Sequence, residues 1–292
     1  MTNPLKNSQI RLPFTLCLEP KFPKMLSFPN AKINIGLSIT EKRPDGFHNL
    51  ESCFYPVGWN DVLEVMPAKK LSFKSTGIEI PGNPETNLCL KAYHLVSQDF
   101  KLPPVMIHLH KIVPIGAGLG GGSADCAFTI KTLNDLFELN MSVEMMENYA
   151  RQLGSDCAFF IQNKPKFCFG KGDEFSEIKV DLSDKFIVLV NPNIHISTAE
   201  AYSGVKPQKA NIDLREILQN PVNQWVDEVK NDFENHLLPK YPAIAIIKNS
   251  LYTYEAEYAS MTGSGSTVFG IFDKEINLKE AFVNYSVWQG KM

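Results

Sequence analysis

The stretch PIGAGLGGGSADCA occupies residues 114–127, and five glycines fall within the seven residues 116–122. Ser123 then opens a run that is typical of a helix. A glycine-lined turn before a helix presents unpaired backbone N–H groups and the positive end of the helix dipole. Phosphate is the ligand most often bound at such a turn. A tight turn between packed backbones needs fewer glycines than this. We therefore interpret the stretch as an anion site that binds phosphate.

Two familiar phosphate-binding motifs do not fit this stretch. Gly116, Gly118 and Gly121 match the dinucleotide fingerprint, but the preceding strand alternates and carries two histidines and a lysine. The first strand of a dinucleotide-binding domain is buried on both faces and almost wholly apolar. A P-loop ends in Gly-Lys followed by Ser or Thr, whereas Gly122 is followed by Ser123 and Ala124.

The flanking sequence mixes strand and helix patterns. Alternation over residues 31–40 predicts a half-buried strand with Lys32 and Asn34 on its polar face, and further strands are expected at 61–68, 71–80, 103–114 and 186–190. Helices are expected at 86–100, 123–140, 142–154, 197–205, 212–219, 221–237 and 242–253, with Ser142 capping one and Thr86 or Asn87 another. Regular βαβ alternation is missing, so the fold class is α+β.

The length of 292 residues suits about two domains. We predict an N-terminal nucleotide-binding domain over residues 26–168 and a C-terminal domain over 169–292. Four prolines interrupt the first 23 residues. We expect residues 1–25 to be a loose arm or to precede the true start at Met25, with little function before Phe28.

The bulk composition points to small-molecule partners. A formal net charge of −3 gives no support for nucleic acid or an anionic membrane as the main partner. No apolar run approaches the roughly 20 residues that a spanning helix needs, and the first residues make a poor secretory signal. The six cysteines are scattered, which is typical of reduced thiols in a cytoplasmic protein.

The glycine stretch resembles the phosphate-binding motif of the galactokinase, homoserine kinase, mevalonate kinase and phosphomevalonate kinase superfamily. Three further stretches, PNAKINIGLSITEKRPDGFHNLES (29–52), GSDCAFF (154–160) and MTGSGSTVFGIF (261–272), resemble the 4-diphosphocytidyl-2-C-methyl-D-erythritol kinase family. This resemblance implies a two-lobed kinase fold whose N-terminal lobe is like ribosomal protein S5 domain 2, with the active site in the cleft between lobes. It also implies ATP-dependent phosphorylation of a 2-hydroxyl group on the non-mevalonate route to isoprenoid precursors.

Two catalytic residues follow from the resemblance. Lys32 stands where the family has its catalytic lysine, although spacing alone favours a solvated strand face. Asp156 stands where the family has its base, although it could simply cap the next turn. The family commonly has Ala before this Asp and Val-Pro after it, where this chain has Ser155, Cys157 and Ala158. We expect altered packing there rather than lost chemistry.

The resemblance also implies the ATP site. Its expected residues are Asn87 and Leu88 beside the adenine, Lys111 near the base, and the loop Pro114, Ile115, Gly116, Ala117, Gly118, Leu119, Gly120, Gly121, Gly122, Ser123 and Ala124. Ser123 is expected to bind a phosphate or its Mg²⁺. Asp125 is expected to face away from the phosphates or to hold Mg²⁺ through water, because a carboxylate repels phosphate. The cofactors expected are therefore ATP and Mg²⁺.

The PDGFH segment implies the second substrate. In the resembling family the ring at position 47 stacks on cytosine and the next histidine binds the base edge. Phe47 replaces the usual Tyr, so it keeps the stacking face and loses a hydroxyl. The other expected substrate residues are Asn34, His48, Thr198, Tyr202, Gly263 and Ser264, with Tyr202 on the opposite side of the base.

Other functions remain as alternatives at this point. A homoserine, mevalonate or sugar kinase would have no evident use for Phe47 and His48. A non-catalytic nucleotide-binding protein would not need both Lys32 and Asp156. The interpretation as an NAD-dependent oxidoreductase rests on the glycine spacing alone. The sequence is compatible with a monomer or a homodimer.

Overall fold

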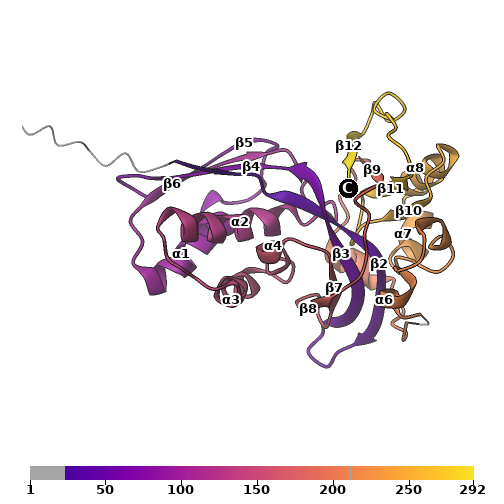
Figure 1. Ribbon diagram of the computed structural model, residues 1–292, viewed down its shortest axis with the longest axis horizontal. Coiled ribbons are helices and arrows are strands. Elements are labelled where there is room, and N and C mark those ends of the chain that lie inside the picture. The colour runs from indigo at the N-terminus through magenta and orange to yellow at the C-terminus, as the bar shows by residue number, and fades with distance from the viewer. Residues whose placement is uncertain (1–23, 211) are drawn as a thin grey trace, which may run out of the picture.

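The computed structural model describes residues 24–210 and 212–292, and a long antiparallel hairpin runs through its centre. The hairpin consists of β2 (Asn30–Lys42) and β3 (His48–Asn60), and the sheet order β2-β3-β7-β8 is completed by β7 (Lys166–Phe169) and β8 (Glu174–Glu177). This sheet lies between the two halves of the molecule (Figure 1). The predicted arm 1–25 lies outside the described residues except for Lys24 and Met25, and β1 begins at Met25.

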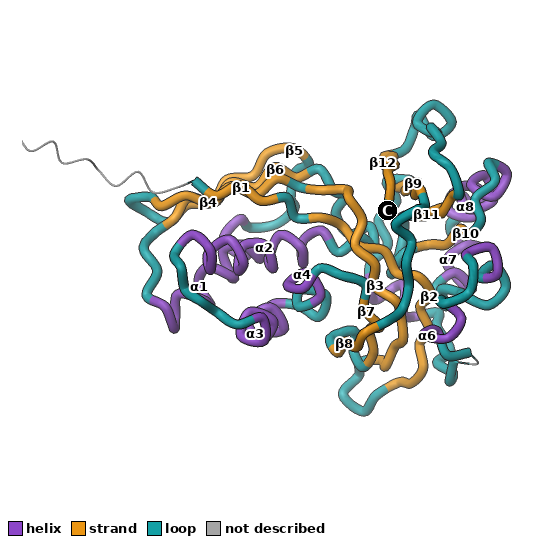
Figure 2. Tube along the Cα trace, viewed as in Figure 1, coloured by secondary structure: helices purple, strands orange, loops and turns teal. Residues whose placement is uncertain are grey.

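A second sheet forms the outer layer of the N-terminal half. Its strands follow the order β1 (Met25–Ser27), β4 (Val62–Pro67), β6 (Val105–Lys111) and β5 (Ser72–Gly77). Helices α1 (Leu88–Phe100) and α2 (Gly121–Leu136) cover one face of it (Figure 2). Helix α3 (Val143–Leu153) lies below these two, and α4 (Phe159–Gln162) lies beside α2. A short 3₁₀ turn, η1 (Pro84–Thr86), precedes α1.

The third sheet belongs to the C-terminal half. Its strands follow the order β10 (Tyr258–Met261), β11 (Val268–Phe272), β9 (Phe186–Asn191) and β12 (Ser286–Lys291). The helices of this half are α5 (Thr198–Ser203), α6 (Leu214–Ile217), α7 (Glu234–Lys240) and α8 (Pro242–Thr253), with a 3₁₀ turn η2 (Val222–Gln224). The observed mixture confirms the α+β class. The predicted boundary at 168/169 falls within β7 and stays a prediction.

Both faces of β2 are buried, so the predicted half-buried strand is wrong in one respect. Ile33 and Ile35 pack against Leu189 and Phe269 of the C-terminal sheet in one continuous apolar cluster. Lys32, on the face expected to be solvated, is only 3% exposed. Alternation identifies the two faces of a strand but does not reveal that polar loops cover the second one.

The helix predictions are confirmed where local signals are strong. The Asn87 side chain accepts a hydrogen bond from the Cys89 N–H at 2.8 Å and caps α1, and Ser142 caps α3 by accepting from the Met145 N–H at 3.1 Å. The predicted helix over 221–237 is wrong. Helix α7 begins only at Glu234, because the side chains just before it bind neighbouring strands instead of allowing a regular helix.

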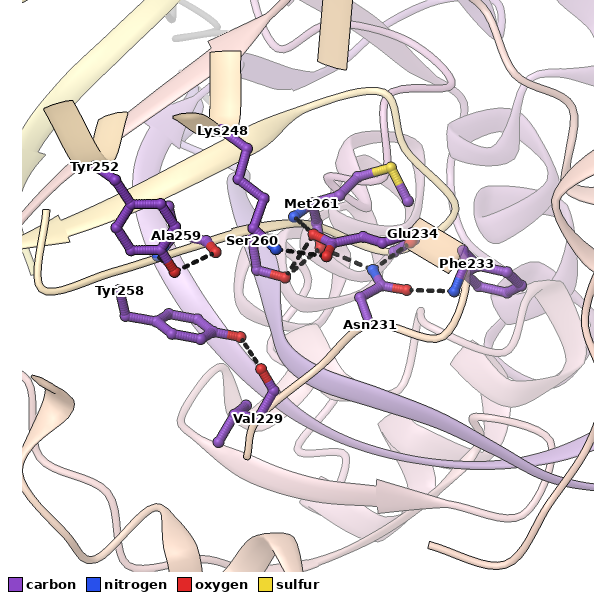
Figure 3. A network of polar contacts seen from close by, with 11 residues as sticks. Val229, Asn231, Phe233, Glu234, Lys248, Tyr252, Tyr258, Ala259, Ser260 and Met261 are labelled. Carbon is purple, nitrogen blue, oxygen red and sulfur yellow. Dashed lines mark hydrogen bonds and ion pairs between the residues drawn. The ribbon is translucent and has the colours of Figure 1, made fainter. Parts of the chain in front are cut away.

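Those side chains form the network in Figure 3. The Asn231 amide donates to the carbonyl oxygens of Met261 (2.7 Å) and Gly263 (2.9 Å), and its oxygen accepts from the Phe233 N–H (3.0 Å). The buried Glu234 carboxylate accepts from the Met261 N–H at 2.7 Å and from the Lys248 ammonium at 2.6 Å. The segment before α7 is thereby joined to β10 and to the glycine turn that follows it.

We expect Asn231→Ala to destabilise the protein by roughly 2–3 kcal/mol, because two buried carbonyl groups lose their donor. Asn231 itself is 1% exposed. Urea unfolding followed by circular dichroism measures the effect. Asn249→Ala, at an exposed position of α8, is the matched control and should change the free energy of unfolding by less than about 0.5 kcal/mol. Equal stabilities for the two variants would mean that the Asn231 hydrogen bonds do not stabilise the fold.

Candidate active site

A cavity of about 690 Å³ lies along the glycine loop. Its walls come from the loop itself, from the segment around Ile80–Leu88, and from His195–Thr198 with Ser264 of the C-terminal half. Of the predicted ATP residues, the cavity is lined by Asn87, Leu88, Lys111, Pro114, Ile115, Gly116, Ala117, Gly118, Leu119, Gly120, Gly121, Gly122 and Ser123. Ala124 does not line it, because its methyl group points into the core from the first turn of α2.

The glycines of the loop have two different physical roles. A Cβ at Gly118 would lie 2.1 Å from the carbonyl oxygen of Thr262, so this glycine allows close packing against the second glycine turn. A Cβ at Gly122 would meet nothing within 4 Å. Helix α2 has no side-chain cap, and the amides of its first turn face the cavity end of the helix. The loop therefore packs closely against the second glycine turn and also leaves unpaired amides at the start of α2, as the predicted anion site requires.

The two predicted catalytic residues lie together. The Lys32 ammonium is 3.4 Å from the Asp156 carboxylate and 4.6 Å from the centre of the Phe54 ring. Asp156 sits on the turn between α3 and α4 with its side chain 32% exposed. Cys157 and Ala158, which depart from the family pattern, are buried in the core and leave Asp156 beside Lys32. Lys32 and Asp156 are 124 positions apart in the sequence, and only folding brings them together.

Asn34 positions the lysine rather than lining the cavity. Its side-chain oxygen accepts from the Lys32 ammonium at 2.5 Å, and its amide donates to the Ser52 hydroxyl at 2.9 Å. Its backbone N–H donates to the Thr262 hydroxyl at 2.9 Å. All of these groups are buried. Sequence reasoning missed Thr262, although it directly precedes the singled-out Gly263.

Lys111 lies in a buried charge cluster at the cavity wall. Its ammonium is 2.5 Å from the Asp61 carboxylate and 2.8 Å from that of Asp125. Burial opposes the charged form, but the two carboxylates raise the pKa of Lys111. Burial raises the pKa of the Asp125 carboxyl in spite of the neighbouring ammonium. The sequence did not predict Asp61 as a residue of this site, because a single Asp before a strand belongs to no recognisable motif.

The predicted substrate residues do not all meet. The rings of His48 and Tyr202 stack on each other, with centroids 4.9 Å apart and planes at 26°. Phe47 is 58% exposed, and the Lys171 ammonium lies 5.4 Å from its ring centre. Tyr202 therefore faces His48 rather than Phe47. Burial raises the pKa of the Tyr202 phenol to about 12, with a smaller contribution from the charge of Asp156.

The remaining predicted residues lie near the glycine loop. Thr198 and Ser264 line the cavity. Gly263 packs against Gly118, because a Cβ added at Gly263 would lie 3.1 Å from the Cα of Gly118.

Within residues 24–210 and 212–292 no three His, Cys, Asp or Glu side chains form a group that could hold a metal ion. No helix of that part is long and apolar enough to cross a bilayer.

We expect Lys111→Met to destabilise the protein by about 3–5 kcal/mol, because two buried carboxylates lose their counter-charge. The double variant Lys111→Met/Asp125→Asn should recover part of this loss, since it removes one of the two uncompensated charges. Chemical denaturation at pH 7 measures both. Lys91→Met, on the exposed face of α1, is the control; a Lys111→Met protein as stable as this control would refute the cluster's role.

Comparisons with known proteins place this geometry in a family. The models for the GHMP kinase N-terminal and C-terminal domains match residues 87–164 and 212–285. A 4-diphosphocytidyl-2-C-methyl-D-erythritol kinase of Cytophaga hutchinsonii is 55% identical over 250 residues, covering 85% of this chain and 93% of that protein. The enzyme of the same name from Bacteroides fragilis is 51% identical over 255 residues, covering 86% and 93%.

Solved structures agree with these sequence matches. A crystal structure of 4-(cytidine 5′-diphospho)-2C-methyl-D-erythritol kinase superposes with a TM-score of 0.80 at 26% identity, covering 91% of this chain and 98% of that one. Mevalonate kinase of Methanococcus jannaschii has a TM-score of 0.64 at 14% identity over 94% and 99% of the chains, which shows a shared fold. The chain therefore belongs to the 4-diphosphocytidyl-2-C-methyl-D-erythritol kinase family of GHMP kinases.

Proposed function

We propose that this chain transfers the γ-phosphoryl group of ATP to the 2-hydroxyl of 4-diphosphocytidyl-2-C-methyl-D-erythritol. The observation that carries the proposal is the placement of the Lys32–Asp156 pair, 3.4 Å apart, beside the glycine loop. A Cβ at Gly120 would lie 3.2 Å from the Lys32 side chain, so the lysine lies directly beneath the loop. The acceptor follows from the names of relatives such as the Cytophaga hutchinsonii enzyme, which is 55% identical.

Phosphoryl transfer requires a protein mainly to position the reacting groups and to stabilise negative charge, and this geometry is suited to both tasks. We assign the nucleotide phosphates to the first turn of α2. Asp156 is exposed enough to reach the substrate hydroxyl and takes its proton as that oxygen attacks phosphorus. Lys32 is held by Asn34 and offsets the negative charge that spreads over the transferring group.

Mg²⁺ suits the donor set at the start of α2. The Ser123 hydroxyl lines the cavity, while the carboxylate of Asp125 is already paired with Lys111. Mg²⁺ is usually bound through few protein ligands, with substrate phosphates and water completing its shell. We propose that Ser123 is its ligand from the chain. When bound, the ion neutralises phosphate charge.

The second substrate is assigned to Phe47 and His48. The exposed ring of Phe47 offers a stacking face to cytosine, and the edge of His48 offers a polar contact. The His48 and Tyr202 rings are 4.9 Å apart, which leaves no room for a base between them. Tyr202 therefore joins the base stack only after its ring separates from His48.

We also propose that the enzyme works in the cytoplasm as a monomer or homodimer. The five cysteines in the described part of the chain are buried free thiols, which supports a reducing compartment.

We expect Asp156→Asn to lower kcat by roughly 10²–10⁴-fold with little change in ATP affinity, because the amide cannot accept the proton. Coupled ADP release with ATP, Mg²⁺ and the cytidyl diphosphate substrate measures the rate. Asp184→Asn, at an exposed position of the turn before β9, is a control of the same chemistry. Undiminished turnover in Asp156→Asn would remove the base from the mechanism; activity with homoserine or mevalonate alone would overturn the proposed acceptor.

We expect Phe47→Ala to raise KM for the cytidyl substrate by about tenfold to a hundredfold, since stacking on an aromatic ring is worth about 1–3 kcal/mol per base. The KM for ATP should stay unchanged, because Phe47 does not line the nucleotide cavity. Phe47→Tyr keeps the ring and should behave like the wild type. If Phe47→Ala leaves both KM values unaltered, the stacking assignment is wrong.

A further inference from the structure

The nucleotide cavity contains few positive charges for a ligand as anionic as ATP. Among the described residues that line it, the basic side chains are Lys111 and His195. Lys111 is buried and already shared between Asp61 and Asp125. Lys32 is not a lining residue and is committed to Asn34 and Asp156. His195 is therefore the basic group at the cavity wall with no carboxylate partner in the described chain.

His195 reaches the glycine loop from the opposite half of the molecule. It lies in the loop between β9 and α5, and its ring atoms Nδ1 and Cε1 are 3.1 Å from the position of a Cβ on Gly116. The imidazole thus packs against the loop backbone at the place where Gly116 leaves room for it. Sequence reasoning missed this residue, because Ile194, His195 and Ile196 form no motif.

The loop that carries His195 is anchored on both sides. The Ser266 hydroxyl donates to the Ile194 carbonyl oxygen at 2.5 Å, and the Asn193 N–H donates to the Asn191 side chain at 2.9 Å. Ile196 is buried in the core. The backbone on either side of the imidazole is fixed, so little ordering is needed when a ligand binds.

The Glu200 carboxylate does not compete for the imidazole. Glu200 accepts hydrogen bonds from Lys240 and Tyr241, both at 2.5 Å. The pKa of Glu200 is lowered mainly by Lys240 and Tyr241, and His195 contributes less. The ring nitrogens of His195 remain available to a ligand in the cavity.

We propose that His195 is a nucleotide-phosphate-binding residue. Its imidazole donates a hydrogen bond to an oxygen of the terminal phosphates from the side opposite the α2 N-terminus. ATP would then bridge the two halves of the protein, with the glycine loop on one side and His195 on the other. This inference rests on the proposed use of ATP and adds a contact to that site.

Equilibrium titration with adenosine, ADP and ATP tests the inference without the second substrate. We expect His195→Ala to weaken ADP and ATP binding about tenfold and to leave adenosine binding unchanged, because only the phosphates lose a partner. His195→Lys should restore most of the affinity, since the ammonium again offers a hydrogen-bond donor to the phosphates. His94→Ala, at an exposed position of α1, is the control and should match the wild type.

Three results would overturn the inference. Equal losses for adenosine, ADP and ATP would mean that His195 shapes the cavity without binding phosphate. Unchanged affinities in His195→Ala would mean that it contacts no ligand. Failure of the wild-type protein to bind ATP would overturn the proposed function itself, and is distinguishable because the control variant would fail in the same way.

Discussion

The close contact between two glycine turns is the constraint on which the site depends. Gly118 lies so near the Thr262 carbonyl that a Cβ would come within 2.1 Å of it. The Thr262 hydroxyl also donates to the Gly118 carbonyl at 3.2 Å and accepts from the backbone of Asn34. The phosphate loop, the second turn and the lysine strand are thus fixed relative to one another. Any side chain at position 118 would push these three elements apart.

The second turn is itself held from behind. Asn231 binds the carbonyl groups of Met261 and Gly263, and Glu234 binds the N–H of Met261 (Figure 3). These contacts are buried, where unsatisfied polar groups are costly. The geometry of the proposed active site is therefore supported by polar contacts from the C-terminal half as well as by the glycine loop.

The two buried lysines of the site region differ in the number of carboxylates that surround them. Lys111 is enclosed by two carboxylates and stabilises the cavity wall. Lys32 has one carboxylate neighbour, Asp156, which is partly exposed and so remains accessible to a substrate. The difference is consistent with the proposed roles, in which Asp156 must reach the substrate while Lys111 stays buried.

Local patterns accounted for much of the fold. The caps at Asn87 and Ser142, the strand at β6 and the helix after the glycine loop were predicted because each depends on neighbours in sequence. The helix over 221–237 was predicted wrongly, because Asn231 bonds to strand β10 and the turn after it, 30 or more residues away. Sequence periodicity contains no information about such partners.

By itself, the sequence determined the α+β class, the glycine-lined turn before a helix and, through resemblance, the pairing of Lys32 with Asp156. Tertiary structure alone decided that the polar face of β2 is buried, that Asn34 holds the lysine, that Tyr202 stacks on His48, and that His195 reaches Gly116. The physical reason is the same in each case. A motif records what a short segment can do, whereas burial, packing and ion pairing depend on segments that only folding brings together.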